Sequence, residues 1–533
     1  MELNKRTIAE RFSRLPQDKQ SIFLEALQQQ GIDFAQLPIV ERTESNDTQP
    51  LSYAQLRQWL LWHMEPQSSA YHITGALTLT GTLYPEALKS CFLALVARHE
   101  ALRTVFRGEG SGAVQVVRDE ADVAVQEFDL TQMEEVDRNA ARDEWITRLS
   151  ETPFDLEQGP LLRVGLLRLA TDEHLLVVVM HHIISDGRSM QLIVDEFAAE
   201  YRARVTGETW QPPAPPIQYA DYAVWQRQWM EAGEKTRQLD YWRAELGDEH
   251  PVLQLPTDHP RRLDGRYRAA RHRVTLPESL VDALRKRAQA QGATLFMALL
   301  TGFQTLLYRY TGMEEIRVGV PIANRHRVET ERVVGFFVNT LVLSNQLSGR
   351  LSLADALEQG KRAALGAQEY QNLPFEQLVE ALKLERSLSH TPLFQVMFNH
   401  QQQDHGALQT LPGLELSTWP LEGKETQFEL TLNVVEHKNG CLEASFVYAE
   451  ELFDSTTVER LYQRYATILE TLAEMPECAL GDIEILDKDE QLQLQVWGVN
   501  TQRYSDVQPI HHLIEHQAAT APEGTALLFE DQS

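Results

Sequence analysis

Two adjacent histidines, His181 and His182, end an apolar run in the stretch "LLVVVMHHIISDGRSMQLIVDEF" at residues 175–197. Asp186 and Gly187 follow four residues after the second histidine. Imidazoles beside a carboxylate and a glycine are compatible with a metal site, with buried packing, or with a general base. The positions of these side chains relative to the strand decide between the three interpretations.

Strand geometry argues against the metal site. Adjacent residues of a strand point to opposite faces, so the two imidazoles cannot easily bind one ion unless the strand has already ended. Packing is a strong alternative, because buried neutral histidines are common. A general base would need one histidine on the open side of the strand end, with its tautomer set by a local hydrogen bond and the N–H groups of the Asp-Gly turn facing an oxyanion. These residue types fit acyl transfer, and no metal is expected, but the pair alone leaves packing and catalysis open.

A second His-His pair, His511-His512, shows that the dipeptide alone does not indicate a functional site. In "HHLIEH" at residues 511–516, His512 and His516 would share one face of a helix. Neither a strand-to-turn junction nor a glycine adjoins this pair. We therefore expect it to be solvent-exposed.

Composition excludes several classes of protein. The 533 residues exceed the size at which single cores stop growing, which predicts at least two lobes or domains. A formal charge of −28 makes binding to a phosphate backbone improbable, so no nucleic acid partner is expected. No segment approaches the ~18 apolar residues of a membrane helix, and the N-terminus lacks the apolar core of a signal peptide, which predicts a cytoplasmic protein without a membrane partner. The cysteines Cys91, Cys441 and Cys478 form no CxxC pair and are interpreted as packing residues.

Periodicity predicts the elements that would hold the histidines in place. Two short helices are expected within residues 5–31, and a further helix begins at Pro85 and covers a sheet. Strand-like runs lie at 114–118, 163–169 and 174–181. Ser189 is expected to cap a helix that follows the last of them. The histidine pair is thus predicted at a strand-to-helix turn.

The run "QPPAPP" at residues 211–216 is too rich in proline for a helix or a strand and predicts a lobe boundary. The second half is similar in plan to the first, with a long helical stretch from residue 279, the strand "EIRVGV", and strand-like runs "FFVNTLVLS", "FQVMFNH" and "FELTLNVVEH". Two α/β lobes of similar plan are the natural interpretation.

The residues around the first histidine pair form a motif that is specific enough to indicate a family. "MHHIISDGRS" resembles the HHxxxDG signature of the condensation domains of non-ribosomal peptide synthetases, which belong to the chloramphenicol-acetyltransferase-like superfamily. Six further stretches are similar to the other core motifs of that family, in the same order: "LSYAQLRQWLL" (51–61), "ARHEALRTVF" (97–106), "YADYAVWQRQW" (219–229), "VVGFFVNTLVL" (333–343), "YQNLPFEQLV" (370–379) and "RSLSHTPLFQ" (386–395). The tail from about residue 509 resembles, more weakly, the opening of an adenylation domain, as though the chain were cut from something longer.

The resemblance implies an α/β (α+β) fold of two acetyltransferase-like lobes in a V with a central substrate tunnel. The expected divisions are a helical segment and linker at 1–47, an N-lobe at 48–216, a C-lobe at 217–490, and a linker with the start of an adenylation domain at 491–533. No cofactor is expected to be bound, since the substrates would be carried on the phosphopantetheine of carrier proteins or on CoA.

The family also implies roles for residues of this chain. The second histidine, His182, is the catalytic one, and it deprotonates or positions the acceptor amine. Asp186 is structural and pairs with an arginine of the other lobe, for which Arg325 in "PIANR" is the best candidate. The candidate catalytic set is His181, His182, Asp186 and Gly187, where Gly187 permits close backbone approach.

Several other residues are assigned to the tunnel or to its support. Asn339 is expected to line the tunnel. Arg57 and Tyr222, like the other arginines and aromatic residues of the motifs, are interpreted as structural support. Arg188 departs from the family, which commonly has an apolar or aromatic residue there; it either lies beside a pantetheine or CoA phosphate or points away.

The expected reaction joins a donor acyl or peptidyl thioester to the amine of an aminoacyl carrier protein. The expected partners are donor and acceptor carrier proteins, a downstream adenylation domain and, for some donors, acyl-CoA. A start at Met1 favours a starter domain with a fatty acyl donor, whereas "EKTRQLDYWRAELGDEHPVLQLPTDHPRR" resembles elongation domains with a peptidyl donor, so both remain open. A non-catalytic recruitment module and an epimerisation-type domain are the alternatives.

Overall fold

The computed structural model describes most of the chain and divides it into two compact units, Met1–Ile483 and Glu484–Ser533. The described residues are 5–32, 34, 37–42, 48–110, 112–120, 123–262, 267–383, 391–403, 406, 411–419, 421, 425–437, 440–499 and 509–525. The motif "RSLSHTPLFQ" therefore lies partly outside the described residues.

A five-stranded sheet in the first half carries the histidine stretch. Its strand order is β12-β2-β7-β6-β5, with β5 and β6 parallel and the other neighbours antiparallel. The strands are β2 (His72–Gly81), β5 (Val125–Asp129), β6 (Leu162–Arg168), β7 (Glu173–His181) and β12 (Leu414–Thr418). The helices beside them are α4 (Pro85–Arg98), α5 (Glu135–Glu151) and α6 (Gly187–Thr206). Most residues of the central strand β7 are buried, which explains its near-continuous run of apolar side chains.

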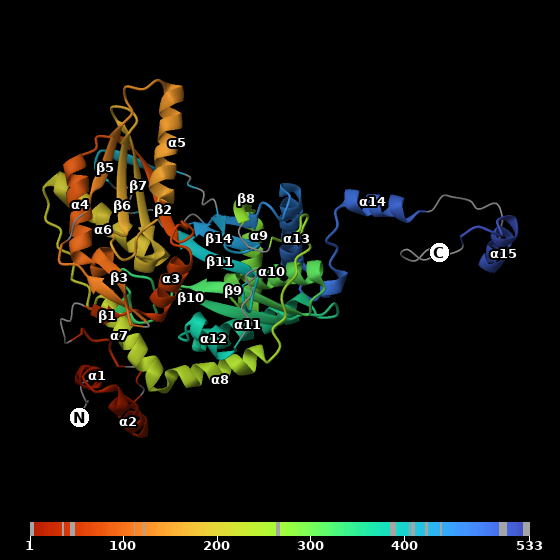
Figure 1. Cartoon of the computed structure of the whole chain (residues 1–533), viewed down its shortest axis with the longest axis horizontal. Coiled ribbons are helices and arrows are strands. Elements are labelled where there is room, and N and C mark those ends of the chain that lie inside the picture. Colours follow the sequence, from red (N-terminus) through yellow and green to blue (C-terminus); the bar gives the residue numbers. More distant parts are fainter. Residues whose placement is uncertain are drawn as a thin grey trace. The chain divides into compact units, whose positions relative to one another are not determined.

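The two faces of this sheet are covered by different helices (Figure 1). Helix α5 packs on one face, where a Cβ on Gly165 would come within 2.2 Å of the Trp145 ring, so the close approach requires glycine. Helix α6 lies on the other face, where a Cβ on Gly75 would be 3.9 Å from the end of the Met190 side chain. Alternate residues of β2 and β7 therefore face either α5 or α6.

A seven-stranded sheet forms the core of the second half. Its order is β10-β9-β11-β14-β15-β8-β13, and β11 runs parallel to both β9 and β14. The strands are β8 (Tyr267–Leu276), β9 (Glu315–Ile322), β10 (Asn339–Gln346), β11 (Val396–Gln403), β13 (Glu425–Thr426), β14 (Leu430–His437) and β15 (Leu442–Ala449). The packed helices are α9 (Glu278–Ala290), α10 (Leu295–Thr311), α11 (Leu353–Glu369) and α13 (Ser455–Glu474). The long helical stretch predicted from residue 279 is thus two helices, because Thr294 caps a new one with its side chain.

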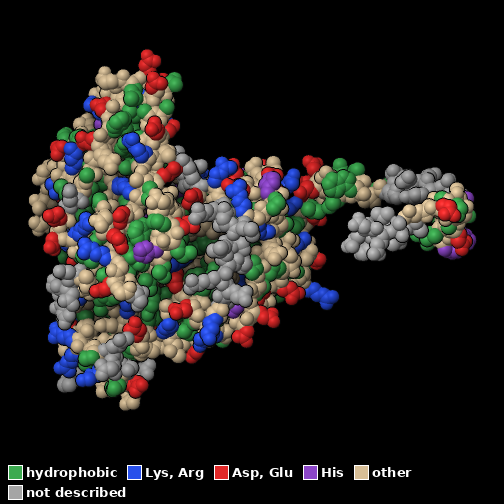
Figure 2. Space-filling view, in the orientation of Figure 1, with side chains coloured by type: hydrophobic (Ala, Val, Ile, Leu, Met, Phe, Trp, Pro, Cys, Tyr) green, Lys and Arg blue, Asp and Glu red, His purple; other side chains and the backbone are tan. Residues whose placement is uncertain are grey.

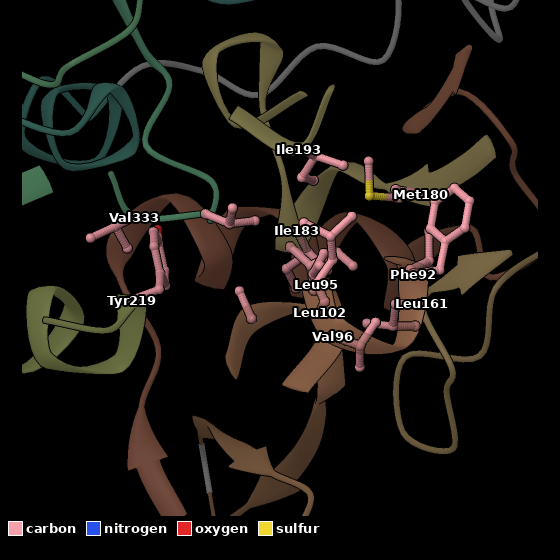
Figure 3. Close-up of a cluster of buried hydrophobic side chains, with 14 of the residues drawn as sticks. Phe92, Leu95, Val96, Leu102, Leu161, Met180, Ile183, Ile193, Tyr219 and Val333 are labelled. Atoms are coloured by element: carbon pink, nitrogen blue, oxygen red, sulfur yellow. The ribbon is translucent and has the colours of Figure 1, made fainter. Parts of the chain in front are cut away.

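The two halves share elements. Strand β12 comes from the second half of the sequence, yet it pairs with β2 in the first sheet. Helix α7 (Tyr219–Trp229) follows the proline-rich run and contributes Tyr219 to the same hydrophobic cluster as the first sheet, and Val333 joins it there (Figure 3). The hydrophobic core is therefore continuous across residue 216, and the lobe limits stay a prediction.

The remaining elements of the first unit connect or flank the two sheets. The predicted pair of N-terminal helices is present as α1 and α2. The predicted strand 114–118 is β4, in a small sheet of order β1-β4-β3. These elements are α1 (Lys5–Ser13), α2 (Gln17–Gln29), β1 (Thr48–Pro50), α3 (Tyr53–Met64), η2 (Glu100–Arg103), β3 (Thr104–Glu109), β4 (Gly112–Val117), η3 (His182–Ile184), η4 (Met230–Glu234), α8 (Lys235–Leu246), η5 (Val328–Thr330), α12 (Phe375–Ala381) and η7 (Leu480–Asp482).

The second unit contains α14 (Lys488–Gly498) and α15 (Ile510–Thr520), neither of which has a buried residue. Its apolar side chains, among them Leu492 and Trp497, are exposed. Figure 2 shows hydrophobic side chains on the surface of this unit. Within the described ranges, no single helix is long and apolar enough to cross a membrane, although α9 and α10, bent by 103° at their break, meet that test as a pair.

Candidate active site

His181 is a packing residue of the first sheet. Its side chain is 4% exposed and lies on the α5 face, with its ring centroid 6.1 Å from that of His72 and 6.2 Å from that of Phe154. Its Nδ1 accepts a hydrogen bond from the backbone N–H of Ile183, at 3.1 Å. Burial lowers the pKa of His181 to about 3, so the ring is neutral at physiological pH.

His182 differs from its neighbour because β7 has ended and a 3-10 turn begins. Its Nδ1 lies 2.9 Å from the carbonyl oxygen of Ser185. Since a carbonyl only accepts, Nδ1 carries the proton and Nε2 keeps a lone pair. Burial lowers the pKa of His182, which favours the neutral form. The Phe336 ring, from the second half of the chain, lies 5.0 Å away and roughly edge-on.

Asp186 begins the helix after the turn. Its carboxylate accepts the backbone N–H of Ser189 at 2.7 Å, so Asp186 and not Ser189 is the N-cap of α6, and the prediction for Ser189 is wrong. An aspartate in extended conformation reaches the third N–H of the helix, whereas Ser189 is already inside the first turn. The same carboxylate accepts the backbone N–H of Phe337 at 3.0 Å. Its two oxygens lie 3.0 and 3.2 Å from Nη2 of Arg325, which confirms the predicted pairing.

Arg325 ties a loop of the second half to this helix start. Its Nη1 donates to the carbonyls of Thr330 at 2.8 Å and Val333 at 2.5 Å, and its Nη2 donates to the Ser189 hydroxyl at 2.7 Å. The guanidinium carbon stands 4.0 Å from the centre of the Phe337 ring. The Asp186 side chain is fully buried and that of Arg325 is 5% exposed, so this pair lies in a medium of low dielectric.

Gly187 and Arg188 are the exposed residues of the turn. A Cβ on Gly187 would meet no atom within 4 Å, so the packing of the chain itself leaves open space there. The Arg188 side chain makes no ion pair within the part of the chain that the structure describes.

Asn339 supports a neighbouring loop. Its amide nitrogen donates to the carbonyls of Gln371 at 3.0 Å and Leu373 at 2.7 Å, and its oxygen accepts the N–H of Phe375 at 3.0 Å. Asn339 also lines, with Tyr222, a cavity of ≈ 10 Å³, about the space of one water molecule. This cavity is too small for a substrate, and the amide of Asn339 acts on the loop 371–375.

Arg57 and Tyr222 hold elements together. Arg57 of α3 forms an ion pair of 3.2 Å with Glu376 of α12 and so bridges the two halves. The Tyr222 hydroxyl lies 3.2 Å from the Gln226 amide nitrogen and 3.4 Å from that of Asn324, and burial raises its pKa. Both contacts agree with the structural roles predicted for these residues.

Tyr71, which sequence analysis did not single out, also lies at this site. Its backbone carbonyl accepts the N–H of His182 at 2.8 Å, one step beyond the ladder pair of His72 with His181. Only the register of β2 against β7 could have identified it. Among the residues that the structure describes, no three His, Cys, Asp or Glu side chains gather as a metal ion would require.

The chain is similar to known proteins in both sequence and structure. The family profile described as "Condensation domain" matches residues 45–495. A linear gramicidin synthase from Brevibacillus parabrevis is 40% identical over 487 residues, which cover 91% of this chain and 9% of that protein. The chain spans a tenth or less of the length of the first curated relatives that it matches.

Solved structures show the same architecture. The X-domain from teicoplanin biosynthesis is 28% identical, with a TM-score of 0.75 over 84% of this chain and 100% of that one. The condensation domain from the monacolin K polyketide synthase MokA is 23% identical, with a TM-score of 0.71 over 82% of this chain and 100% of that one, a likeness that shows the fold alone. The predicted α/β class with acetyltransferase-like lobes is confirmed.

Proposed function

The chain belongs to the condensation-domain family of non-ribosomal peptide synthetases, and from that membership we propose that it forms an amide bond between a donor thioester and the amine of an aminoacyl group on a carrier protein. The donor acyl or peptidyl group would arrive on the phosphopantetheine of a carrier protein or on CoA. The enzyme would thus act as an acyltransferase in non-ribosomal peptide or lipopeptide synthesis.

The observation that carries the proposal is the tautomer of His182. Its Nδ1–H is committed to the Ser185 carbonyl, so Nε2 is the nitrogen that can take a proton. An α-ammonium has a pKa near ~8 and is mostly protonated at neutral pH, so it must lose a proton before it can attack. A neutral imidazole of lowered pKa is available as acceptor over the whole physiological range.

The proposed step balances without a further reactant. The amine nitrogen attacks the thioester carbonyl carbon, the C–N bond forms, and the C–S bond then breaks. The α-ammonium first releases one proton to solvent. The attacking neutral amine then loses a second proton, which passes to Nε2 of His182 and from there to the departing thiolate, which leaves as a thiol. Much of the acceleration comes from holding two tethered substrates together, because a thioester is already an activated donor.

The surrounding residues fit supporting roles. The buried pair of Asp186 and Arg325 fixes the turn after His182, and Arg57 with Glu376 joins α3 to α12 nearby. We propose that the exposed Arg188 lies beside the pantetheine arm or its phosphate, and that Asn339 borders the substrate tunnel through the loop that it holds. The proposed lobes are 48–216 and 217–490, with a helical segment at 1–47.

The proposed partners are donor and acceptor carrier proteins and an adenylation domain that begins within 491–533. Intact mass spectrometry of the acceptor carrier tests the reaction and identifies the donor. Aminoacyl carrier is offered fatty acyl-CoA in one reaction and a peptidyl carrier in another. A mass increase equal to the acyl or the peptidyl group is expected in one of them, and no increase with any donor would contradict the proposal.

A specific likeness favours a second candidate, a non-catalytic recruitment module. The X-domain of teicoplanin biosynthesis was solved in complex with OxyB, so a domain of this fold can serve as a binding partner. A recruitment module would bind its partner and make no amide in the assay above. An epimerisation-type domain would also leave the carrier mass unchanged in water, but it would add one mass unit to the loaded aminoacyl group in D₂O.

A further inference from the structure

Tyr71 and His182 occupy neighbouring positions directly beyond the paired ends of β2 and β7. In the antiparallel ladder His72 pairs with His181, and the Tyr71 carbonyl accepts the N–H of His182 at 2.8 Å, which continues the register by one residue. The rings of His72 and His181 lie together on the α5 face. Tyr71 directly precedes β2 and His182 begins the 3-10 turn after β7, so the two residues lie side by side at this end of the sheet, joined by that backbone hydrogen bond.

A shared neighbour supports this placement. The charge of Arg57 acts on both Tyr71 and His182, and the charge of Glu376 acts on Tyr71. Arg57 and Glu376 are the ion pair that joins the two halves. Tyr71 therefore lies near this junction, where the substrates are proposed to meet.

The phenol is available as a hydrogen-bond donor. The residue is only partly buried, and its hydroxyl oxygen has no hydrogen-bond partner within the described chain. Burial of the residue raises the pKa of Tyr71, so the hydroxyl keeps its proton. One alternative donor in the turn is already used, because the Ser189 N–H is bound to Asp186.

We propose that Tyr71 is a further catalytic residue, whose hydroxyl donates a hydrogen bond to the carbonyl oxygen of the donor thioester as that oxygen becomes an oxyanion. As the amine attacks, the π electrons of the carbonyl move onto the oxygen, and they return when the thiolate leaves. The phenol keeps its proton throughout, while His182 handles the proton of the amine. This role rests on the proposed amide-forming function.

Tyr71→Phe tests the role with the smallest change, since it removes only the hydroxyl. We expect the single-turnover rate of amide formation to fall by about 10²- to 10³-fold, the usual loss for one oxyanion donor. The exposed Tyr84 provides a matched control, and Tyr84→Phe should keep the wild-type rate.

Ligand binding separates a catalytic role from a structural one. Donor analogues are compared in which the thioester is replaced by a planar amide or by a tetrahedral phosphonate. Tyr71→Phe should weaken binding of the phosphonate by at least about 10-fold and leave binding of the amide unchanged. Equal weakening of both analogues would overturn the role.

The outcomes also distinguish this inference from the function on which it rests. If wild-type protein forms the amide and Tyr71→Phe does so within about threefold of its rate, well short of the loss expected for an oxyanion donor, the role of Tyr71 is wrong and the proposed function stands. If wild-type protein forms no amide with any donor, both fail together.

Discussion

The chain contains the dipeptide His-His in two regions that differ in almost every physical respect. His181 ends a buried strand and His182 begins the turn after it, and the two rings have different neighbours, His72 for the first and Phe336 for the second. His511 and His512 lie on the exposed helix α15, which has no buried residue, with their ring centroids 4.3 Å apart. In the second region the two imidazole rings contact each other, whereas in the first region each ring contacts a different residue.

The difference follows from what surrounds each pair. At residues 181–186 the strand end, a 3-10 turn and the Asp186 cap impose a separate hydrogen bond on each imidazole. At α15 both imidazoles are exposed, and among the residues that the structure describes no hydrogen bond selects one tautomer. A histidine pair therefore carries chemical meaning only where the backbone gives its members different environments.

The largest effect is expected from removal of the support behind the first pair. Arg325→Ala leaves the buried Asp186 carboxylate without its cationic partner. We therefore expect the free energy of unfolding, measured by urea denaturation, to fall by about 3–5 kcal/mol. As a control, Arg362→Ala breaks an exposed pair with Glu358 and should cost under about 1 kcal/mol. Equal effects of the two substitutions would show that the buried pair does not hold the turn.

The variant His182→Ala tests whether His182 is the catalytic member of the first pair. We expect the rate of amide formation to fall at least about 100-fold, because the proton acceptor is lost, with little change in the melting temperature. The measurement is single-turnover mass spectrometry of the acceptor carrier. A variant that kept the full rate would remove the catalytic distinction between His182 and the pair on α15.

The buried neutral His181 should make the free energy of unfolding depend on pH in the acid range. The folded protein keeps it neutral down to a pKa of about 3, whereas the unfolded chain binds a proton below about 6.5. The unfolded state therefore holds more protons in this window, and the free energy of unfolding falls as pH decreases, by up to about 1.4 kcal/mol per pH unit.

In His181→Asn, which retains an acceptor for the Ile183 N–H, the loss of stability between about pH 6.5 and about pH 5 should be smaller than in the wild type. Denaturation curves at several pH values measure it. His512→Asn serves as the control and should follow the wild-type dependence on pH. A His181→Asn variant with that same dependence would mean that His181 is not held neutral by the fold.

The smallest effect is expected at the second pair. With both His511→Ala and His512→Ala, the rate of amide formation and the stability of the first unit should stay within experimental error, because these side chains are exposed. A loss of rate in this double variant would give the second pair a role that its surroundings do not suggest.

Sequence patterns predicted the local elements well. Pro85 begins α4, the apolar run ends at His181, and two helices occupy residues 5–29. Spacing misplaced one cap, since Ser189 is a plausible N-cap by type, and only the backbone conformation shows that Asp186 performs that task. Nothing in the sequence indicated that β12 would cross to the first sheet, because strand pairing depends on the packing of distant segments.

The candidate site divides in the same way. The sequence by itself determined the residue types and the signature around His182, and the family resemblance implied that Asp186 pairs with Arg325. Only the tertiary structure decided which imidazole nitrogen is free, that Asn339 is committed to a loop, and that Tyr71 lies beside His182. The reason is physical: residue types follow from local chemistry, whereas a tautomer or a neighbour depends on contacts such as that of Asp186 with Arg325, 139 residues apart, which form only when the chain packs.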